Sequence, residues 1–199
     1  VRLWRAWRPQ QGWMALTLAW VAVMCLPAAA ITGRLISGLE PLAWLATLAF
    51  VLAWWLASHD PTAGQADRRI SGLAAAGVLA LSGLAADLIW GVRVVRIWPL
   101  AAQLLRWLTW RLGERDLPAP VVTYFQDQWA ALASFGQRLD WWIGGLVRGQ
   151  GTPDNLVVIG LAGLVVWGVA AWAGWWVARR GEPFLGLLPT GALLALHVY

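Results

Sequence analysis

The side chains best suited to catalysis, one cysteine and two histidines, lie far apart in the sequence. Nucleophilic catalysis by cysteine needs an accessible thiolate with a histidine base within hydrogen-bond reach. Cys25 falls inside an apolar run, His59 between two such runs, and His197 near the end of another. We interpret His59 and Asp60 as a solvated pair in a loop. The alternative is that they form half of a catalytic unit. With no phosphate loop, acid–base pair or metal-ligand spacing in the sequence, we expect no catalytic residue, no cofactor site and no metal site.

Asp87 is the main ionisable residue inside an apolar run. It lies close to the end of that run, near Trp90. One interpretation is a carboxylate at a membrane interface, paired with Arg93. The alternative is an intramembrane carboxylate in a proton or ion path, because ionisable residues inside membrane spans are often functional. The alternative predicts that Asp87 faces the interior of the helix bundle.

The amino-acid composition excludes a water-soluble globule. Hydrophobic residues make up 60% of the chain and charged residues 13%, against roughly 45–50% and about 25% in soluble domains. All 15 basic residues are arginine, and the formal net charge is +5. Because the arginines form short clusters between apolar runs, they indicate membrane topology and argue against nucleic-acid binding. The expected partner is therefore the lipid bilayer, with no nucleic acid.

Five apolar runs organise the chain. A membrane-crossing helix needs about 20 mostly apolar residues, because the hydrocarbon layer is roughly 30 Å thick and each residue rises about 1.5 Å. Four runs meet this test and the fifth is shorter: 13–31, 41–57, 70–90, 156–178 and 184–199. We therefore predict an all-α fold, a polytopic integral membrane helical bundle of about five spans, with interfacial amphipathic helices.

Tryptophans and small residues mark features of these runs. Of the 18 tryptophans, several lie at the ends of apolar runs, as membrane-interface anchors do: Trp13, Trp54, Trp55, Trp90, Trp175 and Trp176. Gly72, Ala76 and Ala80 recur every four residues and share one helix face. This stripe indicates either close helix packing or chance in an alanine-rich segment.

The arginine distribution predicts the orientation. Cytoplasmic loops carry an excess of arginine and lysine. The N-terminus and two connections between runs are therefore expected on the cytoplasmic side, because they contain Arg2, Arg5 and Arg8, Arg68 and Arg69, and Arg179 and Arg180. Tyr199 then lies outside, as does the segment 91–153, whose seven arginines depart from the rule. Long translocated segments follow the rule less strictly. The first run is interpreted as an uncleaved anchor, the alternative being a signal peptide cleaved near Ala28-Ala29-Ala30.

The segment 91–153 is too polar to cross a membrane and has helical periodicity. Val94, Val95, Trp98, Ala101 and Leu104 begin an apolar stripe typical of a helix in the headgroup zone. Pro118 and Pro120 are expected to break this helix, and a second amphipathic stretch follows. Asp154 is expected to cap the next span. Two interpretations of the segment remain open, a pair of interfacial helices and a docking surface for a neighbouring domain.

Two motifs carry a resemblance to a known family. The opening Arg8-Pro9-Gln10-Gln11-Gly12-Trp13 precedes the first run. The second motif leads into the last run and continues within it: Arg179-Arg180-Gly181-Glu182-Pro183-Phe184-Leu185-Gly186-Leu187-Leu188-Pro189-Thr190-Gly191. Together with the order of spans, they resemble the N-terminal membrane region of bacterial transglutaminase-like membrane proteins of the TgpA type. In that family a catalytic domain with a cysteine, histidine and aspartate triad follows the spans on the outer side. The resemblance implies such a domain beyond Tyr199, and no catalytic residue carries over.

These patterns predict three regions and a non-enzymatic role. We expect residues 1–90 to form a three-span part, 91–153 an extracytoplasmic amphipathic helical segment, and 154–199 a two-span part. The expected function is that of a module embedded in the bacterial cytoplasmic (inner) membrane. It is expected to anchor and position an extracytoplasmic transglutaminase/protease-like domain in the C-terminal part of the same polypeptide. The alternatives are a small transporter or permease subunit, with Asp87 in its path, and a structural envelope protein that docks partners through 91–153.

Overall fold

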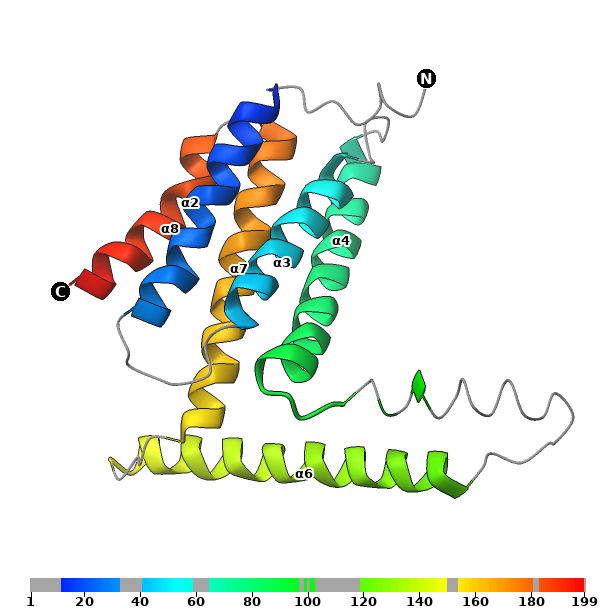
Figure 1. The fold of residues 1–199 in the computed structure, drawn as a ribbon. Helices are drawn as coiled ribbons and strands as arrows, with labels where there is room; N and C mark the ends of the chain where they lie inside the picture. Colours follow the sequence, from blue (N-terminus) through cyan, green and yellow to red (C-terminus); the bar gives the residue numbers. More distant parts are fainter. Residues whose placement is uncertain are drawn as a thin grey trace, which may run out of the picture. The chain divides into compact units, whose positions relative to one another are not determined.

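Helices are the only regular secondary structure in the described part of the chain in the computed structural model (Figure 1). The structure describes residues 12–32, 41–58, 65–96, 99, 101–102, 119–149, 154–180 and 183–198. Six α-helices occur there: α2 (Gly12–Thr32), α3 (Pro41–Ser58), α4 (Gln65–Ala86), α6 (Ala119–Val147), α7 (Asn155–Arg180) and α8 (Pro183–Val198). A π-helical turn, η1 (Asp87–Gly91), continues α4. The predicted all-α class is confirmed.

Among the described residues, three stretches of helix are long and apolar enough to cross a membrane. They are Pro41–Ser58, Gly72–Gly91 and Asn155–Arg179, which correspond to the second, third and fourth predicted spans. The first and fifth predicted spans form shorter apolar helices, Met14–Ala30 and Pro183–Leu196. The sequence therefore predicted the positions of the apolar helices to within a few residues.

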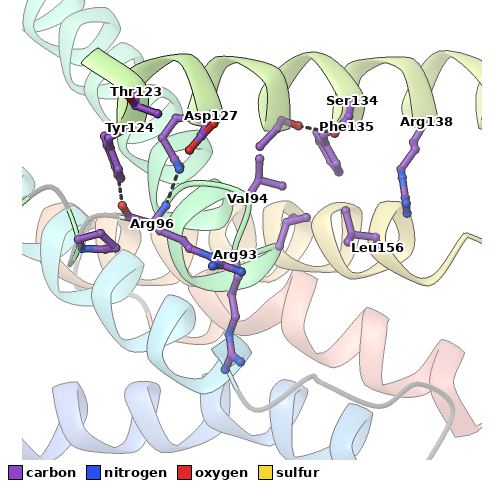
Figure 2. A pocket seen from close by; sticks show the side chains of 14 residues that line it. Arg93, Val94, Arg96, Thr123, Tyr124, Asp127, Ser134, Phe135, Arg138 and Leu156 are labelled. Atoms are coloured by element: carbon purple, nitrogen blue, oxygen red, sulfur yellow. Dashed lines mark hydrogen bonds between the residues drawn. The ribbon is translucent and has the colours of Figure 1, made fainter. Parts of the chain in front are cut away.

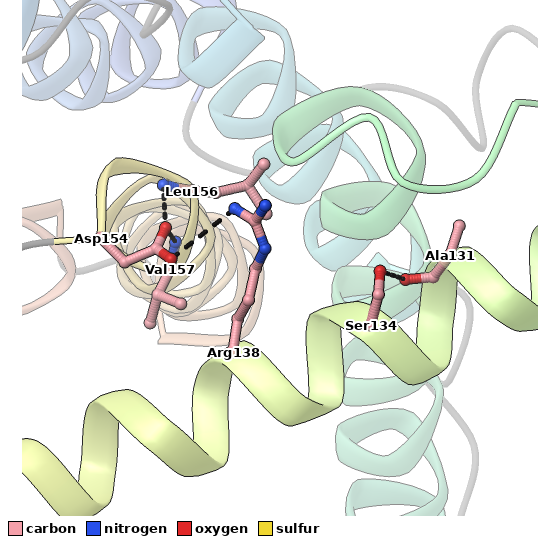
Figure 3. Close-up of polar contacts among 6 residues, drawn as sticks. All are labelled: Ala131, Ser134, Arg138, Asp154, Leu156 and Val157. Atoms are coloured by element: carbon pink, nitrogen blue, oxygen red, sulfur yellow. Dashed lines mark hydrogen bonds and ion pairs between the residues drawn. The ribbon is translucent and has the colours of Figure 1, made fainter.

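Local sequence explains where several helices begin. Pro41 and Pro183 are the first residues of α3 and α8, where a missing backbone N–H costs no helical hydrogen bond. Asp154 precedes α7, and its Oδ1 accepts hydrogen bonds from the amides of Leu156 at 3.0 Å and Val157 at 3.4 Å (Figure 3). The predicted cap at Asp154 is confirmed, because its carboxylate satisfies amides that have no partner within the helix.

The chain divides into two compact units. The first contains residues 1–87 and 161–199, and the second residues 88–160. In the first unit α2 contacts α3 and α8, and α3 contacts α4. The core of this unit contains small and branched apolar side chains, including Ala19, Val23, Leu42, Leu45, Ala49, Phe50, Val166 and Ala170.

Glycines allow the α7 backbone to approach its neighbours in the first unit. A Cβ atom at Gly174 would lie 3.2 Å from the Phe50 Cα atom of α3. A Cβ at Gly186 of α8 would lie 3.3 Å from the Ala173 carbonyl oxygen. The stripe that begins at Gly72 has no such role there, since a Cβ at Gly72 would meet nothing within 4 Å and Ala76 and Ala80 are not buried. Close approach therefore occurs at glycines outside that stripe.

The second unit contains α6, one long amphipathic helix. It begins at Ala119, so Pro120 lies in its first turn rather than outside it. A proline in the first turn lacks only an N–H that has no intrahelical partner. That Pro118 and Pro120 end a preceding helix stays a prediction, because residues 103–118 lie outside the described residues. Large apolar side chains remain exposed on α6, among them Phe125, Trp129, Trp141 and Ile143.

The segment before residue 97 is not the helix that its periodicity predicted. Val92 to Arg96 are non-helical, and Arg93 has a φ of 55°. Three of these five residues are valine, whose branched Cβ disfavours helix. The Arg96 amide donates to the Gln128 Oε1 atom at 2.9 Å, and Val95 donates to the Leu88 carbonyl at 3.0 Å. Most of the predicted first amphipathic helix lies outside the described residues.

Candidate functional site

A buried carboxyl group occupies the end of α4 in the first unit. Asp87 is 3% exposed, and it is the first residue of the π-helical turn. Its Oδ1 atom has no hydrogen-bond partner among the described residues. π-Helical turns inside α-helices occur frequently at functional sites. Asp87 therefore faces the interior of the first unit rather than its surface.

The wall around Asp87 comes from two other helices. A Cβ atom at Gly163 of α7 would lie 2.9 Å from the Asp87 Cγ atom, so the carboxyl group rests directly on the α7 backbone. The same position is 3.4 Å from the Leu45 Cδ1 atom of α3. Leu45 is fully buried. The carboxyl group thus lies against the α7 backbone, in a region that an apolar side chain of α3 also borders.

A second contact lies one helical turn away, and here the glycine belongs to α4 and the covering side chain to α7. A Cβ atom at Gly83 of α4 would lie 2.6 Å from both Cδ1 and Nε1 of Trp167. The Trp167 indole N–H donates to the Leu79 carbonyl at 3.0 Å. Leu79 is four residues before Gly83, and residues four apart share a helix face. The missing side chain at Gly83 therefore lets the indole reach a backbone carbonyl.

The two contacts form one reciprocal interface between α4 and α7. Asp87 is four residues after Gly83, and Trp167 four residues after Gly163. In each pair a large or polar side chain from one helix covers a glycine of the other. The helices run antiparallel, because the earlier α4 residue pairs with the later α7 residue. We call these residues, Gly83, Asp87, Gly163 and Trp167, the α4–α7 glycine interface. It holds the Asp87 side chain in a single environment.

The chemistry open to this site is that of a buried carboxyl group whose Oδ1 atom has no hydrogen-bond partner among the described residues. An ionised carboxylate without a partner is costly in an apolar interior. A group in such a place is suited to taking up and releasing a proton or a small cation. The position of Asp87 at a membrane interface stays a prediction, and within the first unit its side chain is buried. Its pairing with Arg93 stays a prediction, because Arg93 belongs to the second unit.

Of the other candidate residues, only Cys25 has a side chain that the structure describes. Cys25 is exposed on α2, and its thiol donates to the Val21 carbonyl at 3.5 Å. His59 lies outside the described residues, and His197 is in α8 with its side chain outside them. Among the described residues no three histidine, cysteine, aspartate or glutamate side chains gather as metal ligands would. The expected lack of a catalytic centre stays a prediction.

Sequence reasoning identified Asp87 but missed its neighbours. Gly163 and Trp167 lie in the middle of the fourth apolar run, among several glycines and tryptophans. Glycine inside an apolar helix is a signal of close helix approach. That signal does not tell which glycine is covered, since Gly168 on the same helix meets nothing within 4 Å. The partner of each glycine required the structure.

Comparison with known proteins does not assign this chain to a family. No protein-family model, no curated protein and no solved structure matches the chain. The resemblance to TgpA-type membrane regions therefore rests on the two sequence motifs and the order of the apolar runs.

Proposed function

We propose that this chain is a five-span membrane module that anchors and positions an extracytoplasmic transglutaminase-like domain of the same polypeptide. The observation that carries the membrane part is the exposure of large apolar side chains on the first unit. Trp44, Leu73, Leu81 and Leu196 are each more than 70% exposed. Soluble monomers rarely expose extended apolar surface of this kind. A bilayer would cover it.

The proposal assigns membrane crossings to α2 and α8 in addition to the three apolar stretches in α3, α4 with η1, and α7. The 21 residues of α2 correspond to roughly 30 Å at a rise of about 1.5 Å per residue, which matches the hydrocarbon layer. The 16 residues of α8 reach roughly 24 Å, and the bilayer can thin locally around a short span. Both helices contain an internal proline, Pro27 and Pro189. Proline is tolerated in spans when neighbouring helices pack against it.

The orientation in this proposal follows the arginine distribution. The N-terminus and the helix ends with Arg68 and Arg179 are cytoplasmic, and residues 91–153 are extracytoplasmic. The membrane is the cytoplasmic membrane of a bacterium. With five spans, the chain beyond Tyr199 emerges on the outer side, where the resembling family carries its catalytic domain.

The anchoring role is tested by the gene beyond the codon for Tyr199. The proposal expects an open reading frame that encodes a folded domain with a cysteine, a histidine and an aspartate. In intact spheroplasts, externally added protease should release this domain, while the spans stay in the membrane fraction. A stop codon at that point, or a domain that only protease in lysed cells can reach, would overturn it.

A second candidate function is a carboxylate-dependent proton or cation path. The specific observation in its favour is Asp87, which is 3% exposed and has an Oδ1 atom without a partner among the described residues. The smallest discriminating change is Asp87→Asn, which keeps the shape and removes the charge. Asp140→Asn is the matched control, because Asp140 is an exposed carboxylate on α6.

The test measures proton flux into liposomes that contain the full chain and a trapped pH-sensitive dye. The second candidate expects the wild type and Asp140→Asn to dissipate an imposed pH gradient. Asp87→Asn is expected to dissipate it at a rate at least about tenfold lower. Equal rates for all three proteins, or rates equal to those of empty liposomes, would rule out the path.

A further inference from the structure

The second unit contains a cavity of about 770 Å³ with a basic wall. It lies between α6 and the segment 92–96, as Figure 2 shows. Polar and charged side chains make up much of its lining: Arg93, Arg96, Thr123, Tyr124, Asp127, Gln128, Ser134 and Arg138. The lining has three arginines and one aspartate, so its formal charge is +3 − 1 = +2. A cavity of this size and charge can hold an anionic group.

The backbone of the segment 92–96 is attached to α6 at one residue. The Tyr124 hydroxyl donates to the Arg96 carbonyl, and the Arg96 amide donates to the Gln128 Oε1 atom at 2.9 Å (Figure 2). Tyr124 and Gln128 are one helical turn apart on α6. Both polar groups of the Arg96 backbone are therefore bound, and the Arg96 side chain remains available.

Arg93 has a backbone conformation that needs an explanation. Its φ of 55° lies in the left-handed region, which residues other than glycine adopt uncommonly. Such residues persist where the surroundings determine the conformation, and they cluster at ligand sites. Val95 adds a hydrogen bond to the Leu88 carbonyl at 3.0 Å, which closes the chain around Arg93. The segment therefore presents Arg93 and Arg96 from a constrained loop.

Arg138 completes the basic wall from α6. Its guanidinium lies 3.7 Å from the carboxylate of Asp154, which is the N-cap of α7 (Figure 3). The Arg138 side chain is 57% exposed. An exposed ion pair at this distance holds its partners only weakly. The guanidinium thus keeps donors for a second anion, whereas Asp127 is the one acidic group in the lining.

We propose that this cavity binds a phosphate group through Arg93 and Arg96. The planar guanidinium presents paired donors that match phosphate oxygens, and arginine is preferred over lysine where this geometry matters. A phosphate diester of an anionic lipid headgroup and a free phosphate ion share this chemistry. The exposed Phe125, Trp129 and Trp141 of α6 are typical of a helix at a lipid headgroup layer, where the first source is present.

The test compares binding of two ligands to the full chain purified in a neutral detergent. The first arm titrates phosphatidylglycerol against phosphatidylcholine and counts bound lipids by native mass spectrometry. The second arm titrates inorganic phosphate by calorimetry. The proposal expects saturable binding in at least one arm. Competition by phosphate at millimolar concentration indicates the free ion as a ligand, and lipid binding without such competition indicates the headgroup.

The decisive variant is Arg93→Gln with Arg96→Gln. Charged hydrogen bonds are strong enough that this variant should lose about tenfold or more in affinity. Arg148→Gln is the matched control, because Arg148 is exposed on the second unit and does not line the cavity. It should bind within about twofold of the wild type, since one distant exposed charge contributes little.

A second variant distinguishes binding by paired guanidinium donors from general attraction by positive charge. It also gives a second result if the first variant misfolds. Arg93→Lys with Arg96→Lys keeps both charges and removes the paired donors, so affinity should still fall by about threefold or more. All variants must show the helix content of the wild type by circular dichroism. Wild-type affinity in both double variants, or no binding of either ligand to the wild type, would overturn the proposal.

Discussion

Gly163 leaves the space on α7 that the Asp87 carboxyl group occupies. A Cβ atom at this position would lie 2.9 Å from the Asp87 Cγ atom, which is closer than real Cβ contacts allow. The carboxyl group cannot withdraw along a flexible stem, because an aspartate side chain is short. The residue at 163 is therefore as important for the site as Asp87 itself.

Replacement of this glycine should destabilise the protein. Gly163→Ala is expected to lower the free energy of unfolding by about 1–3 kcal/mol, the usual cost of overpacking a tight site. Gly168→Ala is the control on the same helix, since a Cβ there meets nothing within 4 Å. It should be neutral or stabilising by up to about 1 kcal/mol, because alanine favours helix. Unfolding in a titration with SDS, followed by tryptophan fluorescence, measures both, and equal effects would contradict the geometry.

Tyr124 connects pH to the stability of the second unit. Burial raises the pKa of the Tyr124 hydroxyl above its usual value of 10.0. Because the folded protein holds this proton more tightly than the unfolded chain, the contribution to stability is complete below pH 10 and is lost as pH rises through the folded pKa. The ionised oxygen can no longer donate to the Arg96 carbonyl.

Thermal denaturation of the full chain in detergent between pH 8 and about 12 tests this bond. The wild type should lose more stability above pH 10 than Tyr124→Phe, which lacks the hydroxyl. At pH 8 the variant should be less stable by about 1 kcal/mol, the typical net value of one hydrogen bond. Parallel losses for the two proteins across the whole range would show that the Tyr124 hydroxyl makes no such contribution.

At the scale of elements, α4 and α7 are joined by paired glycine contacts. Gly83→Ala should force the Trp167 indole away from the Leu79 carbonyl, to which it donates at 3.0 Å. We expect a loss of about 1–3 kcal/mol in the SDS titration. Gly77→Ala is the control on α4, with no atom within 4 Å of its Cβ. A Gly83→Ala variant as stable as Gly77→Ala would mean that the indole does not cover Gly83.

The start of α7 depends on Asp154. Asp154→Ala removes the acceptor for the Leu156 and Val157 amides and should cost about 1 kcal/mol. Asp154→Asn keeps an oxygen acceptor and loses only the exposed ion pair with Arg138, so it should remain close to the wild type. Thermal denaturation in detergent compares the two. Similar losses for both would assign the stability to the ion pair instead of the cap.

The sequence predicted elements better than it predicted contacts. Hydropathy located α3, α4 and α7 because twenty apolar residues in a row leave few alternatives. The periodicity around Val94 wrongly predicted a helix for residues 92–96, which are non-helical. An apolar pattern carries no information on the hydrogen bonds that Tyr124 and Gln128 make with the Arg96 backbone. Asp87 was recognisable as unusual. Its burial depends on Gly163, which is 76 positions later in the sequence (163 − 87), and no local pattern indicates that pairing.

At the scale of the whole molecule, the two units have different surfaces. The first exposes bulky apolar side chains such as Trp44 and Leu81, as a membrane-embedded bundle does. The second combines the amphipathic α6 with an arginine-lined cavity. This contrast is what the proposed topology requires, with apolar helices in the hydrocarbon layer and residues 91–153 in the outer headgroup and aqueous zone.

The most direct test of this account is the side of the membrane on which α6 lies. Gln137 is an exposed polar residue of α6 and accepts a cysteine without the strained backbone of Gly149, whose φ is 68°. In a Cys25→Ala background, Gln137→Cys should react with a membrane-impermeant maleimide in intact spheroplasts, and Thr62→Cys only after lysis. Labelling of Gln137→Cys only after lysis, with Thr62→Cys accessible from outside, would contradict the proposed topology.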